Sequence, residues 1–135
     1  MKFDFFGVGS VGPIKHGMTR DEIRKVLCER YDEFKKTEIS TAKTDAFDSL
    51  NLHIFYEESG VVKGVEFFGG SEFYLEGERV VDKSLGFVKG LLEVVGAELD
   101  FNSSGFFVRK SGLRFYVPDI EEDDAVVEAV YVEMN

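Results

Sequence analysis

GVGSVGPIKHGMTRDE, residues 7–22, contains two signals that point to different folds. Its first half has the spacing G-x-G-x-x-G of a dinucleotide site, and its second half has the start of a capped helix. A dinucleotide site requires the helix to begin directly after the glycines, yet residues 13–17 intervene. Thr19 and Glu22 have the capping-box spacing S/T-x-x-E. The stretch therefore predicts a flexible loop followed by a helix capped by Thr19, and no dinucleotide site.

Helical spacing of apolar residues continues from this cap. The stripe consists of Ile23, Val26, Leu27 and Tyr31. A second helix is predicted over residues 85–95, with Asp82 or Ser84 as its N-cap and Gly96 directly after its end. Period-two alternation and turn signals predict strands in the rest of the chain. These strands cover residues 2–6, 50–56, 61–68, 73–75, 106–109, 113–117 and 126–133.

Segments of the first half of the chain resemble segments of the second half in the same order. MTRDEIRKVL (18–27) aligns with KSLGFVKGLL (83–92), LHIFYEE (52–58) with LRFYVPD (113–119), and VVKGV (61–65) with VVEAV (126–130). The matches predict an α+β fold in one domain, residues 1–135, with internal repeats at about 13–68 and 78–133. Each repeat supplies a helix and a β-meander, and the two join as one antiparallel sheet with the helices on one face.

The helix start GMTRDEI, residues 17–23, together with the duplicated helix–meander, resembles the β-lactamase-inhibitor-protein-like group. The small outer-membrane assembly lipoproteins of the BamE type share this helix start in single copy. The resemblance implies a concave sheet that grips another protein. The second repeat lacks the G-M-T-R letters. We expect no secretion signal, and a single cysteine leaves no pair for a disulfide. The stretch TDAFDSLNLHIFYEESG (44–60) also resembles small bacterial proteins, among which we expect toxin-immunity proteins.

The charge balance narrows the class of partner. The chain has 26 acidic and 16 basic residues, a formal net charge of −10. This disfavours nucleic-acid binding, which needs Lys and Arg to neutralise phosphates, and favours a basic protein partner. A single cysteine, Cys28, cannot form an internal disulfide, and no apolar run reaches the length of a membrane span. We therefore expect a cytoplasmic protein that does not enter a membrane.

The strand alternation predicts which side chains lie on the open face of the sheet. If Leu52, Ile54 and Phe115 face the helices, their sequence neighbours face away. This predicts a partner-binding face that contains His53, Phe55, Arg114 and Tyr116, with Phe68 and Tyr131 as further members. Aromatic side chains mixed with charges are typical of an interface centre. Coverage of this face by a loop, or by a second copy in a homodimer, is the alternative.

An acidic run near the C-terminus is a second candidate site. It consists of Asp119, Glu121, Glu122, Asp123 and Asp124. The simple interpretation is a solvated hairpin tip. The functional interpretation is a negatively charged surface that attracts a basic partner and speeds association with it.

No candidate motif for a catalytic, metal or cofactor site has the flanking sequence that such a site requires. Residues 100–105 imitate half of a calcium loop, but an Asx-type turn is the better interpretation. A Cys28–histidine pair, with His16 or His53, and an acid–base pair drawn from Asp45, Asp48, Glu57 and Glu58 are alternatives without a supporting motif. We expect a non-enzymatic protein without cofactor or metal, an immunity or inhibitor protein that occludes a basic toxin or enzyme. The alternative is a small-ligand or peptide-binding module that uses the same concave face.

Overall fold

The computed structural model describes residues 1–35, 37–39 and 42–135. An antiparallel eight-stranded sheet dominates this part of the chain, with the strand order β10-β11-β12-β13-β7-β6-β5-β4. Its strands are β4 (Asp32–Lys35), β5 (Lys43–Phe47), β6 (Leu52–Tyr56), β7 (Val62–Phe68), β10 (Leu99–Asn102), β11 (Gly105–Val108), β12 (Leu113–Tyr116) and β13 (Ala129–Glu133). The last strand of each half, β7 and β13, pair at the centre of the sheet.

The predicted fold, one antiparallel sheet with helices on one face, is wrong because the chain forms two sheets. The second sheet consists of β1 (Phe3–Gly7), β2 (Ser10–Val11), β3 (Ile14–Lys15), β8 (Phe73–Leu75) and β9 (Glu78–Arg79). Its β1 and β8 run parallel, with Phe3 opposite Phe73. Residues 10–15, which the sequence predicts to be a flexible loop, supply β2 and β3. Because β2 returns antiparallel to β1, no helix follows the glycines as a dinucleotide site requires.

Both predicted helix starts are confirmed. In α1 (Arg20–Leu27) the backbone amide of Glu22 donates to Oγ1 of Thr19, and the amide of Thr19 donates to Oε1 of Glu22, which completes the capping box. In α2 (Leu85–Val94) the amide of Phe87 donates to Oγ of Ser84 at 3.1 Å. The predicted stripe of α1 is too long, because Cys28 adopts a left-handed conformation and ends the helix before Tyr31.

The two helix starts are tied to the sheet by matching backbone hydrogen bonds. In each half, a residue at the helix start bonds to the segment that leads into the last strand. The donor–acceptor pairs are Arg20–Gly60 and Val62–Met18 in the first half, and Leu85–Ala125 and Val127–Lys83 in the second, all at 2.9 Å. The residues of the second half follow those of the first at the same sequence separation that aligns residues 18–27 with residues 83–92. The predicted internal repeats stay a prediction, which this matched geometry supports.

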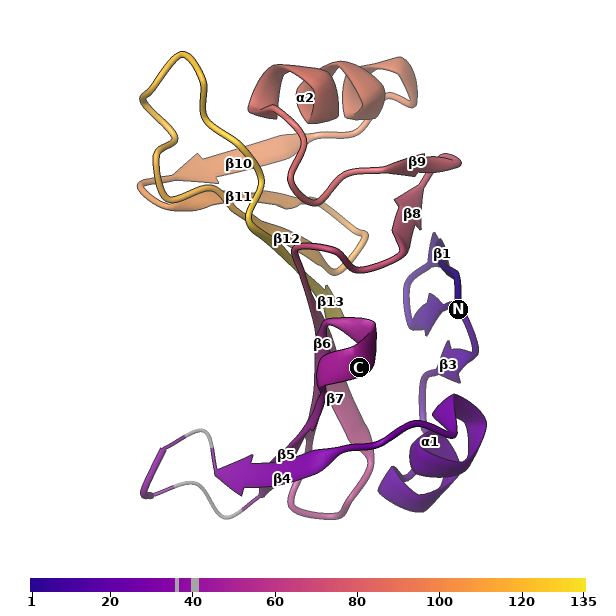
Figure 1. The fold of residues 1–135 in the computed structure, drawn as a ribbon. Helices are drawn as coiled ribbons and strands as arrows, with labels where there is room; N and C mark the ends of the chain where they lie inside the picture. Colours follow the sequence, from indigo (N-terminus) through magenta and orange to yellow (C-terminus); the bar gives the residue numbers. More distant parts are fainter. Residues whose placement is uncertain (36, 40–41) are drawn as a thin grey trace.

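Helices and second sheet lie along the convex side of the curved eight-stranded sheet, and the concave side is open in Figure 1. Phe67 of β7 packs against Phe3 of β1 and Phe73 of β8, with ring centroids 5.3 Å and 4.9 Å apart. All three side chains are fully buried in the core. The second sheet therefore supports the convex side of the large sheet and leaves its concave side to solvent.

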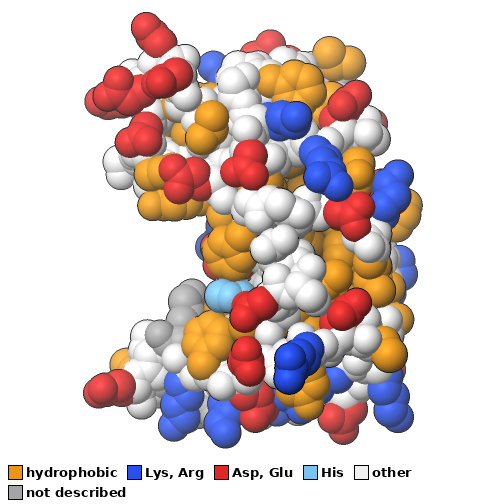
Figure 2. Space-filling model, viewed as in Figure 1, with side chains coloured by type: hydrophobic (Ala, Val, Ile, Leu, Met, Phe, Trp, Pro, Cys, Tyr) orange, Lys and Arg blue, Asp and Glu red, His pale blue; other side chains and the backbone are white. Residues whose placement is uncertain are grey.

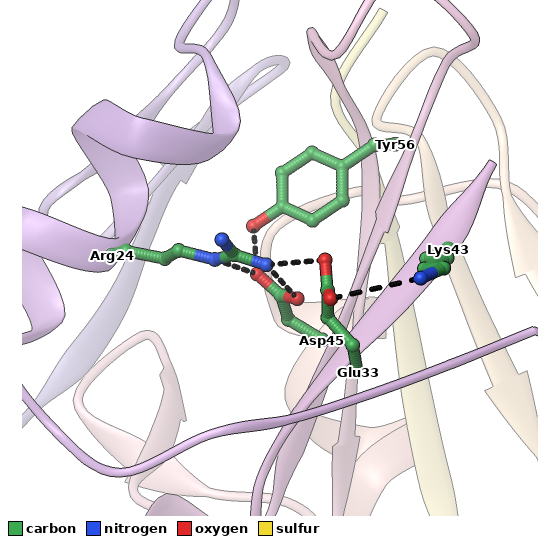
Figure 3. A network of polar contacts seen from close by, with 5 residues as sticks. All are labelled: Arg24, Glu33, Lys43, Asp45 and Tyr56. Atoms are coloured by element: carbon green, nitrogen blue, oxygen red, sulfur yellow. Dashed lines mark hydrogen bonds and ion pairs between the residues drawn. The ribbon is translucent and has the colours of Figure 1, made fainter.

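A buried polar cluster fixes α1 to the sheet edge (Figure 3). Arg24 donates to both carboxylate oxygens of Asp45 at 2.9 and 2.8 Å, and the Tyr56 hydroxyl donates to the same carboxylate at 2.9 Å. The Asp45 side chain has no exposed surface. The hydrogen bond to Asp45 raises the pKa of Arg24, and burial raises the pKa of Tyr56. Arg24 also pairs with Glu33 of β4 at 2.8 Å, so one guanidinium joins α1 to two strands.

The corresponding place in the second half is apolar. Asp45 lies opposite Ile54 in the sheet, and Phe106 lies opposite Phe115, which the repeat alignment matches with Ile54. The Phe106 and Phe115 rings stack with their centroids 4.7 Å apart. Polar anchoring in one half and aromatic packing in the other thus hold equivalent positions.

Replacement of Asp45 by Asn removes the buried one of the two carboxylates that pair with Arg24. We expect the free energy of unfolding to fall by about 3 kcal/mol, because an ion left without its buried partner is costly. Tyr56→Phe removes one hydrogen bond and leaves the ion pair, so a smaller loss of about 1 kcal/mol is expected. Urea unfolding of both variants measures the difference. Equal effects of the two substitutions would contradict the assigned role of the ion pair.

Candidate functional site

The six predicted face residues lie together on the concave side of the sheet. In the register of the sheet, His53 lies opposite Glu66, Glu66 opposite Tyr131, and Tyr131 opposite Arg114. The intervening residues Ile54 and Phe115 belong to the core on the other side, so the predicted alternation is confirmed. Figure 2 shows the concavity in profile, with histidine and hydrophobic side chains at its inner wall. The six are His53, Phe55, Phe68, Arg114, Tyr116 and Tyr131.

Aromatic rings form a continuous strip along this concave face. His53 packs edge-on against Phe34 and Phe68, with ring centroids 5.3 Å and 4.7 Å away, and lies 6.4 Å from Phe55. Phe55 in turn lies 5.9 Å from Tyr131. We call these five side chains, Phe34, His53, Phe55, Phe68 and Tyr131, the aromatic strip. It crosses β4, β6, β7 and β13, so both halves of the chain contribute to it.

Phe34 was missed in the sequence analysis. Its strand, β4, has charged residues on either side of the ring and is exposed along its whole length, so no apolar alternation marks it. The contact between Phe34 and His53 depends on the pairing of β4 with β5 and of β5 with β6. Residues 36–42, KTEISTA, contain no Gly, Pro, Asn or Asp, so the sequence gives no local turn signal for that pairing.

The ring of Tyr131 packs over a glycine on the neighbouring strand. A Cβ atom at Gly64 would collide with the phenol ring of Tyr131, so the ring occupies the space that a side chain at Gly64 would take. The tyrosine is half-buried as a result. Glycine at this interior strand position therefore shapes the floor of the concave face.

A groove of about 1210 Å³ runs along the concave face. Four of the predicted residues line it, namely Phe55, Arg114, Tyr116 and Tyr131. Thr37, Ile39 and Ala42, from the connection between β4 and β5, line it on one side, and Asn102, Ser104 and Phe107 of the β10–β11 hairpin line it on the other. A second hollow of about 350 Å³ is lined by Phe68, Tyr116 and Ala129, with Glu66 and Glu128.

Among the lining residues that the structure describes, carboxylates outnumber cations. Glu57, Glu58, Glu66 and Glu133 line it, against Lys63 and Arg114. The Arg114 guanidinium lies 5.8 Å from the centroid of the Tyr131 ring. Burial is the main cause that raises the pKa of Tyr131 to about 12; the carboxylate of Glu133 adds to it, Arg114 opposes it, and Glu57 and Glu66 add smaller effects. Negative charges therefore outnumber positive ones among the charges that act on the Tyr131 hydroxyl.

The predicted acidic run lies in the connection between β12 and β13, apart from the aromatic strip. Its five carboxylates are all exposed, and none of them lines the groove. A turn, in which the amide of Glu122 donates to the carbonyl of Asp119 at 2.9 Å, holds the loop. Figure 2 shows acidic side chains gathered on the part of the molecule that projects above the concavity, where Figure 1 draws the β12–β13 connection. The structure thus brings the six face residues together and leaves the acidic run at the margin.

The other predicted chemical candidates have structural contacts. His16 Nδ1 lies 2.7 Å from the carbonyl oxygen of Met134, and His53 belongs to the aromatic strip, while Cys28 is exposed at the end of α1. Asp45 is held by Arg24, and Glu57 accepts a hydrogen bond from Asn135. The Asx-type turn predicted at residues 100–105 is confirmed, because the amide of Ser104 donates to Asn102 Oδ1 at 2.9 Å.

Within residues 1–35, 37–39 and 42–135, no group of three or more His, Cys, Asp or Glu side chains is arranged to hold a metal ion. Among the helices of that same part of the chain, none has the length and apolar character to cross a membrane.

Introduction of a methyl group at Gly64 tests whether the Tyr131 ring occupies the space above this glycine. Gly64→Ala is expected to displace the Tyr131 ring and to lower the free energy of unfolding by about 2 kcal/mol, as overpacking does. Gly90→Ala in α2 is the matched control, because a Cβ there meets no atom and alanine favours a helix by up to about 1 kcal/mol. Urea unfolding should give shifts of opposite sign, and destabilisation by both substitutions would contradict the expected collision.

Alkaline titration tests the environment of Tyr131. Its folded pKa of about 12 lies above the unfolded value near 10, so its contribution to stability is complete below pH 10 and is lost as the pH rises towards 12. Tyr131→Phe should remove this part of the alkaline loss of stability, measured by urea unfolding on both sides of the tyrosine titration. An unchanged pH dependence would show that Tyr131 titrates as an exposed phenol.

Comparison with family models, with curated proteins and with solved structures finds no match to this chain. The resemblance that rests on the helix start at residues 17–23 therefore stays a prediction.

Proposed function

We propose that this chain is a non-enzymatic protein that binds a basic protein through its concave face and, as an immunity or inhibitor protein, occludes the working surface of that partner. The single observation that carries the proposal is the aromatic strip, five connected rings on the side of the sheet away from the core. Large aromatic side chains that cluster on an exposed face are typical of the buried centre of a protein interface.

The distribution of charge supports a basic partner. The net charge is −10. Carboxylates exceed cations among the described residues of the groove lining, and the exposed acidic run lies in the β12–β13 connection beside it. Such an arrangement steers a cationic protein towards the concave face and repels nucleic acid. Toxic nucleases are basic because they hold nucleic acid, so an acidic protein of this shape suits them as an inhibitor.

Cytoplasmic residence and kinship with the β-lactamase-inhibitor-protein-like group belong to the same proposal. The single cysteine supports the first, since secreted proteins of this size often rely on disulfides. The helix start at residues 17–23 supports the second.

Peptide or small-ligand binding is the second candidate function, and the groove volume of about 1210 Å³ favours it. That volume exceeds the roughly 300–1,000 Å³ of most small-molecule pockets, so a peptide segment fits it better than a metabolite does.

Affinity capture from the lysate of the native cell, followed by purification of the captured protein, tests the proposed function. We expect a basic protein whose dissociation is accelerated about tenfold or more by Phe55→Ala or Tyr131→Ala, because truncation of a buried aromatic anchor acts mainly on the dissociation rate. Reversal of the acidic run to lysine should slow association about tenfold at low salt.

Glu93→Lys on α2, compared with Glu122→Lys in the acidic run, is the matched control for a single charge reversal. Glu93 is exposed on the helix that packs on the convex side, so its reversal should change the association rate less. A captured partner that binds the aromatic and acidic variants as it binds the wild type would refute the proposed face. Self-association of the wild type through the same face, seen by light scattering, would point to a homodimer instead.

A further inference from the structure

We propose that α2 is a docking surface for a second copy of this chain, with the α2 helices of the two copies packed antiparallel across a two-fold axis. This surface lies on the convex side of the large sheet, apart from the concave face. The inference is therefore independent of the proposed function and concerns how the chain assembles with itself.

Apolar side chains are exposed on the outer side of α2. Phe87 is 44% exposed and Val94 is 86% exposed, and Gly90 lies between them on the same side of the helix. The inner side already supplies Val88 and Leu92 to the core. A surface helix usually carries polar residues on its outer side, so apolar residues on both sides indicate that a further surface covers the outer one.

The matching helix of the first half has a charged outer side. In the predicted repeat alignment, continued by two residues, three exposed charged residues at or just after α1 align with apolar or small residues of α2. The pairs are Glu22 with Phe87, Lys25 with Gly90, and Glu29 with Val94. Both helices pack on the same side of the sheet, yet only α1 has the outer residues that water favours. The difference assigns a binding role to the outer side of α2.

The charges of α2 fit a second copy of the same helix. Within Leu85–Val94 the charged residues are Lys89 and Glu93, one turn apart on the same flank. Two antiparallel helices related by a two-fold axis place this flank of one copy against the same flank of the other. An axis near Gly90 brings Lys89 of each copy to Glu93 of the other, and it sets Phe87 beside Val94.

The neighbourhood of Lys89 is compatible with this contact. Its ammonium lies 5.4 Å from the centroid of the Phe101 ring, which is itself 49% exposed. An ammonium has three N–H donors, so a contact with a ring face leaves donors for a carboxylate. Phe101 therefore extends the apolar surface on the flank that carries Lys89.

Net charge and shape favour α2 over other surfaces for self-association. The chain has a net charge of −10, so two copies repel each other in most orientations. Over α2 one lysine balances one glutamate. A Cβ at Gly86 or Gly90 would meet no described atom within 4 Å, so a second helix can approach the backbone of α2 closely there.

A single pair of helices makes a small interface. The 10 residues of α2 span about 15 Å, which is too short to bury the roughly 1,200–2,000 Å² of a stable complex. We therefore expect a weak dimer with a dissociation constant of about 50 µM. At the low micromolar concentrations of urea unfolding and partner binding the chain is then mainly monomeric, so the Gly90 and Glu93 controls described above act on the monomer.

Sedimentation equilibrium of the full chain, at concentrations on both sides of the expected dissociation constant, tests the inference. We expect a monomer–dimer equilibrium that Phe87→Glu and Val94→Glu each weaken about tenfold or more. Val94 is the more exposed of the two, so Val94→Glu should keep wild-type urea unfolding. Val26→Glu on the exposed side of α1 is the matched control and should leave the dimer unchanged.

Exchange of the two charges tests the antiparallel arrangement. Lys89→Glu alone and Glu93→Lys alone bring like charges together, so each variant should dimerise about fivefold more weakly than the wild type. An equimolar mixture of the two variants should form a heterodimer of wild-type affinity, because each contact then joins opposite charges. Energy transfer between donor and acceptor dyes on the exposed Cys28 of the two variants measures the heterodimer.

Each contrary result overturns a defined part of the inference. A wild type that stays monomeric, or a dimer that Val94→Glu leaves intact, would overturn docking through α2. A dimer lost in Tyr116→Ala and kept in Val94→Glu would assign self-association to the concave face. A mixture that associates no better than either charge variant alone would overturn the antiparallel pairing. None of these measurements uses the captured protein, so a failure of the proposed function leaves the inference standing.

Discussion

The pairing of β7 with β13 is the constraint on which the rest of the molecule depends. Five consecutive pairs, from Ala129 opposite Phe68 to Glu133 opposite Gly64, join strands that close the two halves of the chain. Because side chains alternate along a strand, this register places Phe67 and Val130 in the core and Glu66 and Tyr131 on the concave face. A shift of one residue would exchange the core with the candidate site, so folding and binding depend on the same register.

The convex and concave sides of the large sheet have different chemistry because only one of them is covered. On the convex side α1, α2 and the second sheet bury a continuous apolar core that includes Phe3, Phe67 and Phe73. On the concave side the described part of the chain leaves five aromatic rings beside carboxylates. Phe34 is exposed and the other four rings are half-buried, and the area that they leave in water gives no stability to the monomer. Their burial against a partner therefore supplies the driving force that the proposed function requires.

Local chemistry accounts for what could be predicted from the sequence. The caps Thr19 and Ser84 act within one helical turn, and the alternation of residues 52–56 and 113–116 follows from one buried side, so the facing of His53 and Tyr116 was predictable. The parallel pairing of Phe3 with Phe73, the burial of Asp45 against Arg24, and the contact of Phe34 with His53 each depend on residues distant in sequence. Period and propensity carry no information on such pairings, and the second sheet was missed for this reason. The strands β4, β5 and β10 were also not predicted.

Hydroxyl-radical footprinting of the protein with its captured partner tests most directly whether the concave face is the binding surface. The oxidation rates of single side chains report burial on each side of the sheet. We expect Phe55, Tyr116 and Tyr131 to become protected in the complex, while the exposed Phe6 and Phe87, which lie outside the groove lining, keep their oxidation rates. Protection of Phe6 or Phe87 with unchanged oxidation of Phe55 and Tyr131 would contradict it.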